Sequence, residues 1–318
     1  MPKKIKEENK KIPSIELYGL QNVFDNLKNL YIKKSFPKVL MLTGEKGIGK
    51  FTLCFHLINY FLSDGTEYAY NVEKRSINKK NTVFNQLVSG TSPNYTYISN
   101  ENNSKANIEL IREIKKSFIN STLNDKPRFI LFDDVEHLNL NTANSLLKLI
   151  EEPSDTNYFI LINNKRNFLI ETIKSRAIET KIFLTINDKK SIFNNLTNLH
   201  DLDHHFSFDF INHTSPGLLL EYSKILDKYN INTETSLYDA VSIFLEKFKK
   251  TKNEILLDCI NFFLEIKTSS INKNNIKSVL SINTRYNLMK LIYNYKKFNL
   301  TNNSVLEYIK KTESHFHA

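Results

Sequence analysis

Short apolar runs alternate with amphipathic segments along roughly the first 185 residues. Three of the runs are nearly continuously hydrophobic, as expected of parallel strands that are buried on both faces. Strands that alternate with helices indicate βαβ units, so we predict an α/β domain with a parallel sheet over residues 1–185. The expected strands are 39–43, 95–99, 128–132, 158–162 and 180–184.

Helices are expected between these strands, at 51–62, 106–120 and 141–153. In the last of them apolar residues recur at the i, i+3, i+4, i+7 spacing of an amphipathic helix, and Pro153 ends it. The segment 66–92 is polar and irregular, so we expect it to be an exposed excursion.

Past residue 185 the strand patterns disappear and amphipathic helices follow one another. We therefore predict two all-α domains after the α/β domain, one over 186–228 and one over 229–318. The expected helices lie at 189–199, 215–226, 237–250, 253–268, 284–298 and 302–314.

Composition narrows the class of protein. Lys and Arg number 44 against 34 Asp and Glu, a formal charge of +10, which suits a polyanionic partner such as nucleic acid and equally a Lys-rich soluble surface. The two cysteines, Cys54 and Cys259, are too far apart for a CxxC-type zinc site, and Cys54 falls in an apolar helical pattern typical of a buried residue. No apolar run reaches the ~18 residues of a membrane span. The N-terminus has no apolar core of a secretory signal, so we expect a soluble, cytoplasmic protein.

A phosphate-binding loop follows the first expected strand, in "VLMLTGEKGIGKFTLCFHLI". A strand, a Gly-rich turn and a helix N-terminus let backbone N–H groups face an anion, and Lys50 would reach the β and γ phosphates. Phe51 stands where a Ser or Thr hydroxyl would ligate Mg²⁺. Thr52 cannot substitute, because one helical step rotates a side chain by roughly 100°. The loop residues are Gly44, Gly47, Gly49, Lys50 and Thr52.

An acid pair, Asp133 and Asp134, ends the strand "RFILF" at the carboxyl edge of the sheet, where ligands of open α/β folds bind. In P-loop hydrolases the first acid holds the metal and a following Glu polarises water. Asp134 is one methylene shorter than that Glu. We therefore predict that fast hydrolysis is absent, and the sequence leaves open whether ATP, ADP or nothing binds.

Several stretches together resemble the AAA+ clamp-loader family of bacterial DNA polymerase III, and within it the delta-prime type of subunit. They are "GEKGIGKFTL", "FDDVEHLNLNTANSLLKLIEEPSDTNYFILI", "LIETIKSRA" and "TSPGLLL". The resemblance covers roughly residues 13 to 225. It implies an AAA+ P-loop sheet domain, a helical lid domain at 186–228 and a C-terminal oligomerisation collar at 229–318.

The resemblance also assigns residues. Arg176 in "SRA" matches the arginine that these subunits insert into a neighbour's ATP site, although Ala177 replaces the usual Cys. Asn163 or Asn164 falls where the first sensor residue would be, and Leu218 stands where ATP-binding relatives carry the second-sensor Arg. Many relatives carry a four-cysteine zinc module, which two cysteines cannot form. The resemblance thus implies no zinc, no required cofactor and no metal at the site.

Taken together, these departures predict a subunit that does not hydrolyse ATP and supplies an arginine finger in trans. The implied partners are gamma/tau ATPase subunits and a delta subunit in a hetero-pentamer, the sliding clamp and primer–template DNA, with no membrane. An arginine finger is worth 10³ to 10⁵ in rate in phosphoryl transfer. The alternatives are an active AAA+ ATPase of the gamma/tau or branch-migration type, a small-molecule P-loop kinase and a pure scaffold.

Overall fold

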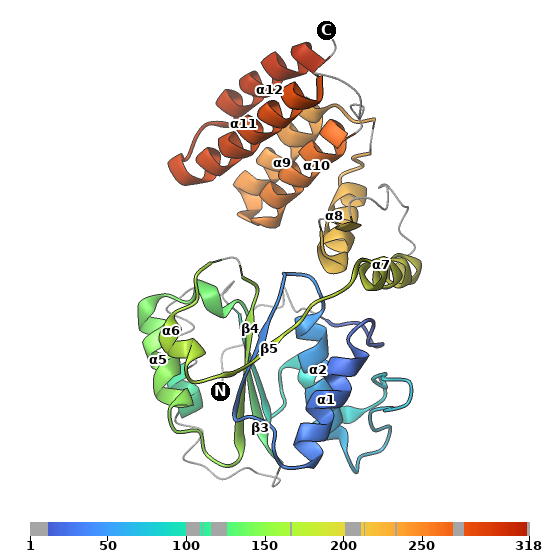
Figure 1. Ribbon diagram of the computed structural model, residues 1–318, viewed down its shortest axis with the longest axis vertical. Coiled ribbons are helices and arrows are strands. Elements are labelled where there is room, and N and C mark those ends of the chain that lie inside the picture. The colour runs from blue at the N-terminus through green and yellow to red at the C-terminus, as the bar shows by residue number, and fades with distance from the viewer. Residues whose placement is uncertain are drawn as a thin grey trace. The chain divides into compact units, whose positions relative to one another are not determined.

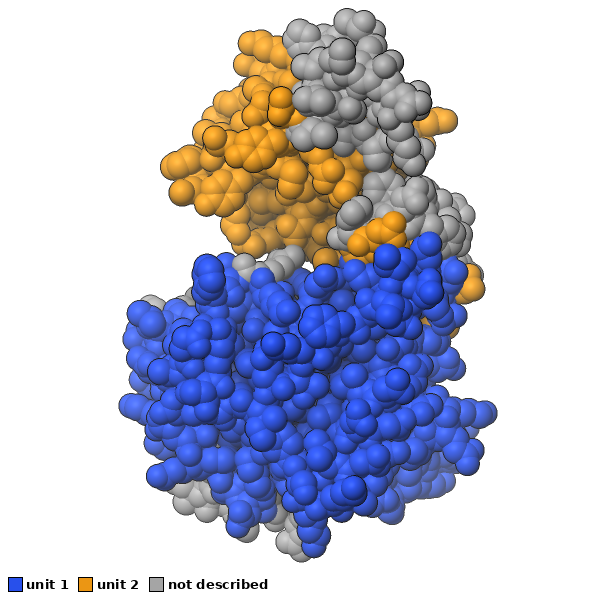
Figure 2. Space-filling view, viewed as in Figure 1, with its two compact units in different colours: residues 1–195, 215–217 blue, residues 196–214, 218–318 orange. Residues whose placement is uncertain are grey.

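The computed structural model describes residues 12–99, 109, 111–115, 126–165, 167–200, 211–212, 214–232, 234–269 and 277–316. The chain divides into two compact units (Figure 1, Figure 2). The first comprises residues 1–195 with 215–217, and the second comprises 196–214 with 218–318. The division into three domains at residues 185 and 228 stays a prediction.

The first unit is built on a five-stranded sheet in the order β2-β3-β4-β1-β5. All four strand pairings are parallel. Parallel neighbours require crossover connections, and helices supply them here. The strands are β1 Val39–Thr43, β2 Tyr95–Ile98, β3 Arg128–Phe132, β4 Asn157–Asn163 and β5 Ile178–Lys181.

Side chains of the central strands alternate between two hydrophobic cores. Leu40 and Leu42 enter the core beneath α1 (Gln21–Ile32) and α2 (Lys50–Ser63). Val39 and Met41 enter the opposite core, which includes residues of α5 (Leu140–Ile150) and of α6 (Glu171–Lys174). Helices thus cover both faces of the sheet (Figure 1). Burial on both faces explains why these strands read as unbroken apolar runs.

The prediction of the last strand was wrong in its position. It was expected at 180–184, whereas β5 covers Ile178–Lys181. β5 lies at the edge of the sheet and its side chains are largely exposed, so hydrophobicity does not mark it. The buried Ile182 instead follows the strand, and its N–H donates to the Thr43 carbonyl.

The segment 66–92 is also more ordered than predicted. It contains α3 (Thr82–Ser89), whose Phe84 and Leu87 are buried. Asn81 caps this helix by accepting hydrogen bonds from two backbone N–H groups, and Gly90 ends it with φ +72°. An Asn cap and a left-handed glycine are sufficient to delimit a short helix in a polar segment. Of the helix expected at 106–120, residues 109 and 111–115 are described and helical.

Helices make up the described part of the second unit, as predicted. Helix α9 packs against α10 and α12, and α11 packs against α10 and α12, so the four form a closed set (Figure 1). No helix among the described residues combines the length and hydropathy of a bilayer span. The bounds are α7 Ile186–His200, which begins in the first unit, α8 Pro216–Lys228, α9 Leu237–Thr251, α10 Ile255–Ser269, α11 Lys277–Phe298 and α12 Asn302–Phe316.

Candidate functional site

The Gly-rich loop of residues 44–50, which the sequence predicts to bind phosphate, lies between β1 and α2. Gly47 and Gly49 have φ values of +83° and +95°, a region that strongly favours glycine. A Cβ on Gly44 would lie 2.7 Å from the Ile182 carbonyl oxygen, so that position has no room for a side chain. Positive φ values thus favour glycine at positions 47 and 49, and close packing against backbone requires it at position 44.

The Lys50 side chain is bound within the loop itself. Its Nζ donates to the carbonyls of Gly44 at 2.7 Å and Glu45 at 2.6 Å, and the residue is buried. Burial lowers the pKa of Lys50 to about 8, against the opposing effect of nearby carboxylates, led by Asp133. The cation that would bind phosphate thus has loop oxygens as partners already.

Phe51 is linked to the acid pair through the aromatic ring of Tyr97. Its ring lies edge-on to Tyr97, with centroids 5.3 Å apart, and the Tyr97 hydroxyl donates to Asp133 Oδ2 at 3.1 Å. Asp133 Oδ1 accepts the N–H of Asp134 at 3.0 Å. Both oxygens of Asp133 are therefore engaged by protein groups, and Phe51 offers no oxygen ligand. This donor set fits Mg²⁺ poorly. Thr52 is half-buried on α2.

Two asparagines stand at the end of β4, beside the acid pair. Asn163 is the last residue of β4, and its carbonyl accepts the Gly44 N–H at 3.2 Å. The amide of Asn164 donates to Asp134 Oδ1, and its backbone N–H donates to Glu136 Oε1 at 3.0 Å. Of the two candidates, Asn164 is therefore the one whose side chain reaches the acid pair.

Glu136 is a buried acid that the sequence analysis missed. It follows the acid pair in "DDVEH", and a third acid so close to the end of β3 was the available signal. Ligand atoms of Asp134, Glu136 and His137 lie within 4.8 Å of one another. Because Asn164 already donates to both acids, their hydrogen bonds explain the cluster without an ion.

A second contribution that sequence reasoning missed comes from residues 215–217, which belong to the first unit. Ser215 Oγ donates to the Lys46 carbonyl at 2.5 Å, and the Gly217 N–H donates to the Gly47 carbonyl at 2.9 Å. Lys189 Nζ also lies 3.1 Å from Glu45 Oε2. We call these contacts of 215–217 with the loop the latch. The latch fixes two consecutive loop carbonyls from far along the chain.

Arg176 lies on the surface one residue beyond the C-cap of α6. Its Nη2 pairs with Glu151 Oε1 at 2.9 Å, and Nη1 donates to the Thr172 carbonyl at 3.0 Å. Both side chains of the ion pair are substantially exposed, at 36% for Arg176 and 48% for Glu151. A guanidinium has five N–H donors, so these contacts leave donor capacity unused.

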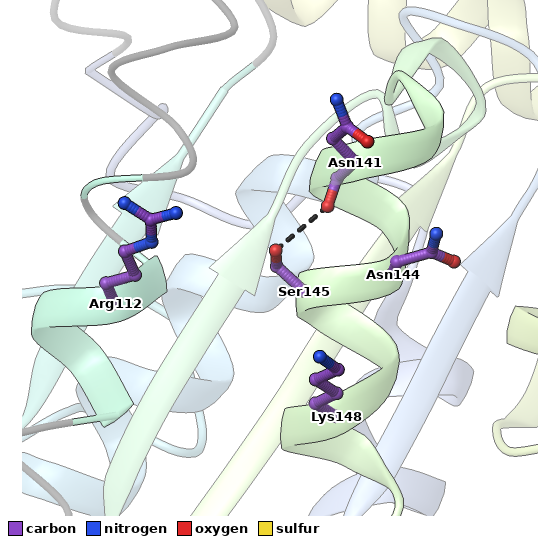
Figure 3. Close-up of a pocket in the computed structure, with 5 residues that line it drawn as sticks. All are labelled: Arg112, Asn141, Asn144, Ser145 and Lys148. Carbon is purple, nitrogen blue, oxygen red and sulfur yellow. Dashed lines mark hydrogen bonds between the residues drawn. The ribbon is translucent and has the colours of Figure 1, made fainter.

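A separate pocket of about 320 Å³ lies along one side of α5 (Figure 3). Asn141, Asn144, Ser145 and Lys148 line it at i, i+3, i+4 and i+7 of the helix, and Arg112 faces them from the neighbouring helical residues 111–115. The lining contains amide, hydroxyl and cationic groups, with no carboxylate. Such a surface fits an anion.

The sheet order, with a Gly-rich phosphate loop after β1 and acids after β3, defines an AAA+-type P-loop domain. A gamma-subunit-related protein of DNA polymerase III from Thermotoga maritima shares this fold. Its TM-score is 0.50 at 17% identity, over 90% of this chain and 96% of that one.

The family model described as "DNA polymerase III, delta subunit" matches residues 19–184, just over half of the chain, and the chain belongs to this family. A delta-prime subunit of DNA polymerase III from Buchnera aphidicola subsp. Schizaphis graminum is 25% identical over 189 residues, 55% of each protein. A delta-prime subunit from Buchnera aphidicola subsp. Acyrthosiphon pisum is 22% identical over 301 residues, 90% of this chain and 81% of that protein. The chain thus spans about half the length of the first of these relatives and most of the second.

Proposed function

We propose that the chain is a delta-prime-type subunit of the DNA polymerase III clamp loader and helps to load the sliding clamp onto primed DNA during replication. Membership of the family over residues 19–184 supports this role. So does the match to a delta-prime subunit along 90% of the chain. The proposed partners are gamma/tau and delta subunits in a hetero-pentamer, the clamp and primer–template DNA.

In this role the chain does not hydrolyse ATP, and its loop requires no nucleotide, metal or zinc. The absence of hydrolysis is inferred mainly from the hydrogen bonds inside the loop, in which the Lys50 ammonium donates to the carbonyls of Gly44 and Glu45. The aromatic contact of Phe51 with Tyr97 replaces the alcohol that would hold Mg²⁺. Since Mg²⁺ neutralises much of the charge that develops in phosphoryl transfer, its loss removes most of the rate.

Arg176 is proposed to complete the ATP site of a neighbouring ATPase subunit. Its guanidinium is exposed, and its ion pair with Glu151 is of a kind that contributes about 0–1 kcal/mol. Exchanging that carboxylate for a phosphoryl oxygen therefore costs little. The bond to the Thr172 carbonyl orients the side chain before the neighbour arrives. A planar cation placed in this way stabilises charge developing on the transferred group.

The test is Arg176→Ala in a reconstituted complex with the gamma/tau and delta subunits. DNA-stimulated ATP turnover should fall at least tenfold while assembly stays intact. Lys174→Ala is the matched control, because Lys174 is an exposed cation of the same segment that pairs with Glu171. Unchanged turnover in the Arg176 variant would discard the finger.

The second candidate function is an active ATPase, favoured by the intact backbone of the phosphate loop. Gly47 and Gly49 keep the positive φ values that such a loop uses. Purified alone, an active enzyme would show Mg²⁺-dependent ATP turnover that Lys50→Ala abolishes. The proposed subunit would show neither the turnover nor the dependence on Lys50.

A further inference from the structure

Helix α11 differs from its neighbours in the second unit in what it exposes. The solvent side of α9 carries mainly charged residues such as Glu246 and Lys249, as a surface helix usually does, and the described part of α12 exposes Lys310 beside one large hydrophobic side chain, Tyr308 at 36%. The solvent side of α11 exposes large side chains instead: Tyr286 is 63% exposed, Tyr293 62% and Met289 40%.

Three of the exposed large side chains of α11 form one line along the helix. Tyr286, Met289 and Tyr293 are spaced at i, i+3 and i+7, which places them on one face. Leu288 and Ile292, on the adjoining side of the helix, are buried. The apolar surface of α11 therefore extends beyond the side that is buried within the chain, as expected of a helix that a partner also covers. We call the line Tyr286, Met289 and Tyr293, with Lys290 and Lys297 beside it, the α11 face.

The charges of α11 are of one sign. Residues 277–298 contain no Asp or Glu. Arg285 pairs with Glu265 and Lys296 pairs with Glu254, so α10 and the residue before it neutralise these two.

The α11 face carries two cations for which the described part of the chain provides no carboxylate partner. Lys290 and Lys297 are exposed and make no ion pair with any carboxylate in the described part of the chain. Lys297 Nζ lies 5.6 Å from the centroid of the Tyr293 ring. Its charge is thus next to the aromatic line rather than remote from it.

We propose that the α11 face docks an amphipathic helix of another subunit, one that carries acidic residues beside its apolar stripe. The i, i+3, i+7 spacing fits helix-to-helix packing, in which such residues are the anchors. Lys290 and Lys297 select carboxylates on the occupant. A second copy of this chain is a poor occupant, because it would bring the same positive charge. The inference rests on the proposed function, since the occupant belongs to the clamp-loader complex.

The two tyrosines could also stack the bases of a single nucleic-acid strand. A protein helix is favoured because the exposed centre of the line is Met289, a flexible thioether that packs against varied side chains.

The test uses the full chain with the gamma/tau and delta subunits. Lys290→Glu with Lys297→Glu should weaken assembly at least tenfold, as measured by analytical ultracentrifugation over a concentration series. Lys249→Glu with Lys310→Glu makes the same charge change on α9 and α12 and should shift assembly less than twofold. Circular dichroism melting confirms that each variant is folded.

A photo-cross-linker at Met289 of the otherwise unchanged chain gives an independent readout. A cross-link to an acidic helix of a partner subunit supports the proposal. A cross-link to DNA, or to none of the subunits in an assembled complex, overturns it. Undiminished assembly of the Lys290, Lys297 variant overturns this inference alone. If the unmodified chain does not assemble at all, both this inference and the proposed function fail.

Discussion

Phe51, Tyr97 and Lys50 illustrate how single residues engage the groups of the candidate site within the protein. They supply a ring contact, a hydroxyl on Asp133, and an ammonium on two loop carbonyls. The sequence could predict the missing alcohol at position 51. It could not predict what filled the space, because Tyr97 is distant in sequence and reaches Phe51 only through the pairing of β2 with β3.

Phe51→Thr should supply an alcohol at position 51 without producing hydrolysis, because Asp134 still stands in place of a water-polarising glutamate. The substitution removes contacts of the Phe51 ring with Tyr97 and Phe55. Because the ring is only partly buried, we expect a loss of about 1–3 kcal/mol in the free energy of unfolding, below the range for a fully buried Phe. Urea denaturation measures the loss, and an ATPase assay of the purified chain should stay at background. Brisk turnover would show that position 51 alone had silenced the site.

His56 predicts a pH dependence of stability. It is buried, its Nδ1 lies 2.9 Å from the Tyr70 hydroxyl and its Nε2 lies 3.0 Å from the Ser14 carbonyl. The neutral ring satisfies both, accepting from Tyr70 and donating to Ser14. Burial lowers the pKa of His56 to about 4, against an ordinary value of 6.5.

Because the unfolded chain binds the His56 proton more tightly, stability is fully present above about pH 6.5 and is lost as the pH falls toward 4. These pKa values give a loss of about 2 kcal/mol between pH 7 and pH 5. Urea titrations at the two pH values measure it. His56→Gln should remove that part of the pH dependence; an equal slope in the variant would assign it to other groups.

At the scale of elements, the buried strands were predictable and the exposed or long-range features were not. β1 and β3 fall at the predicted residues because burial on both faces leaves an unbroken apolar run. β5 was misplaced because an edge strand carries no such run. The latch was out of reach for a different reason: nothing local in "TSPGLLL" encodes a contact with a loop 169 residues earlier.

Gly217→Ala tests the latch, because we expect this substitution to lower the free energy of unfolding where glycine-to-alanine changes in helices usually raise it. An alanine inside a helix normally stabilises it by about 1 kcal/mol relative to glycine. At position 217, however, a Cβ would lie 2.6 Å from the Gly47 carbonyl oxygen, which is backbone and cannot turn aside. We expect the variant to be destabilised by about 1–3 kcal/mol, with faster amide hydrogen exchange in residues 44–50. A stabilised variant would mean that residue 217 does not pack closely against the Gly47 carbonyl.

At the scale of the whole molecule, the net charge of +10 matters most where cationic side chains lie next to polar groups. Arg112 and Lys148 face one pocket with Asn141, Asn144 and Ser145 (Figure 3). Neither cation makes an ion pair in the described ranges. Phosphate contacts use this mixture of Arg, Lys, Asn and Ser and carry no sequence information. The pocket is therefore the best candidate among the described residues for the proposed contact with primer–template DNA.

Arg112→Ala with Lys148→Ala should weaken DNA binding by the assembled complex about equally for any sequence. The slope of log K against log salt is negative, and each lost phosphate contact makes it shallower by about 0.9 on duplex DNA. Fluorescence anisotropy over a salt series measures both effects. Lys247→Ala with Lys249→Ala on α9 is the control for net charge. An equal effect of the control would mean that the pocket is ordinary surface.

The ring contact at Phe51 also bears on how many substitutions the proposed non-hydrolysing subunit would need to become an ATPase. A threonine at position 51 would lose the contact with Tyr97 and Phe55, and the acids would still lack a glutamate at position 134. Under the proposed function, a variant with the threonine alone would be less stable and would gain no turnover. Packing at Phe51 would thus oppose the acquisition of hydrolysis by single substitutions.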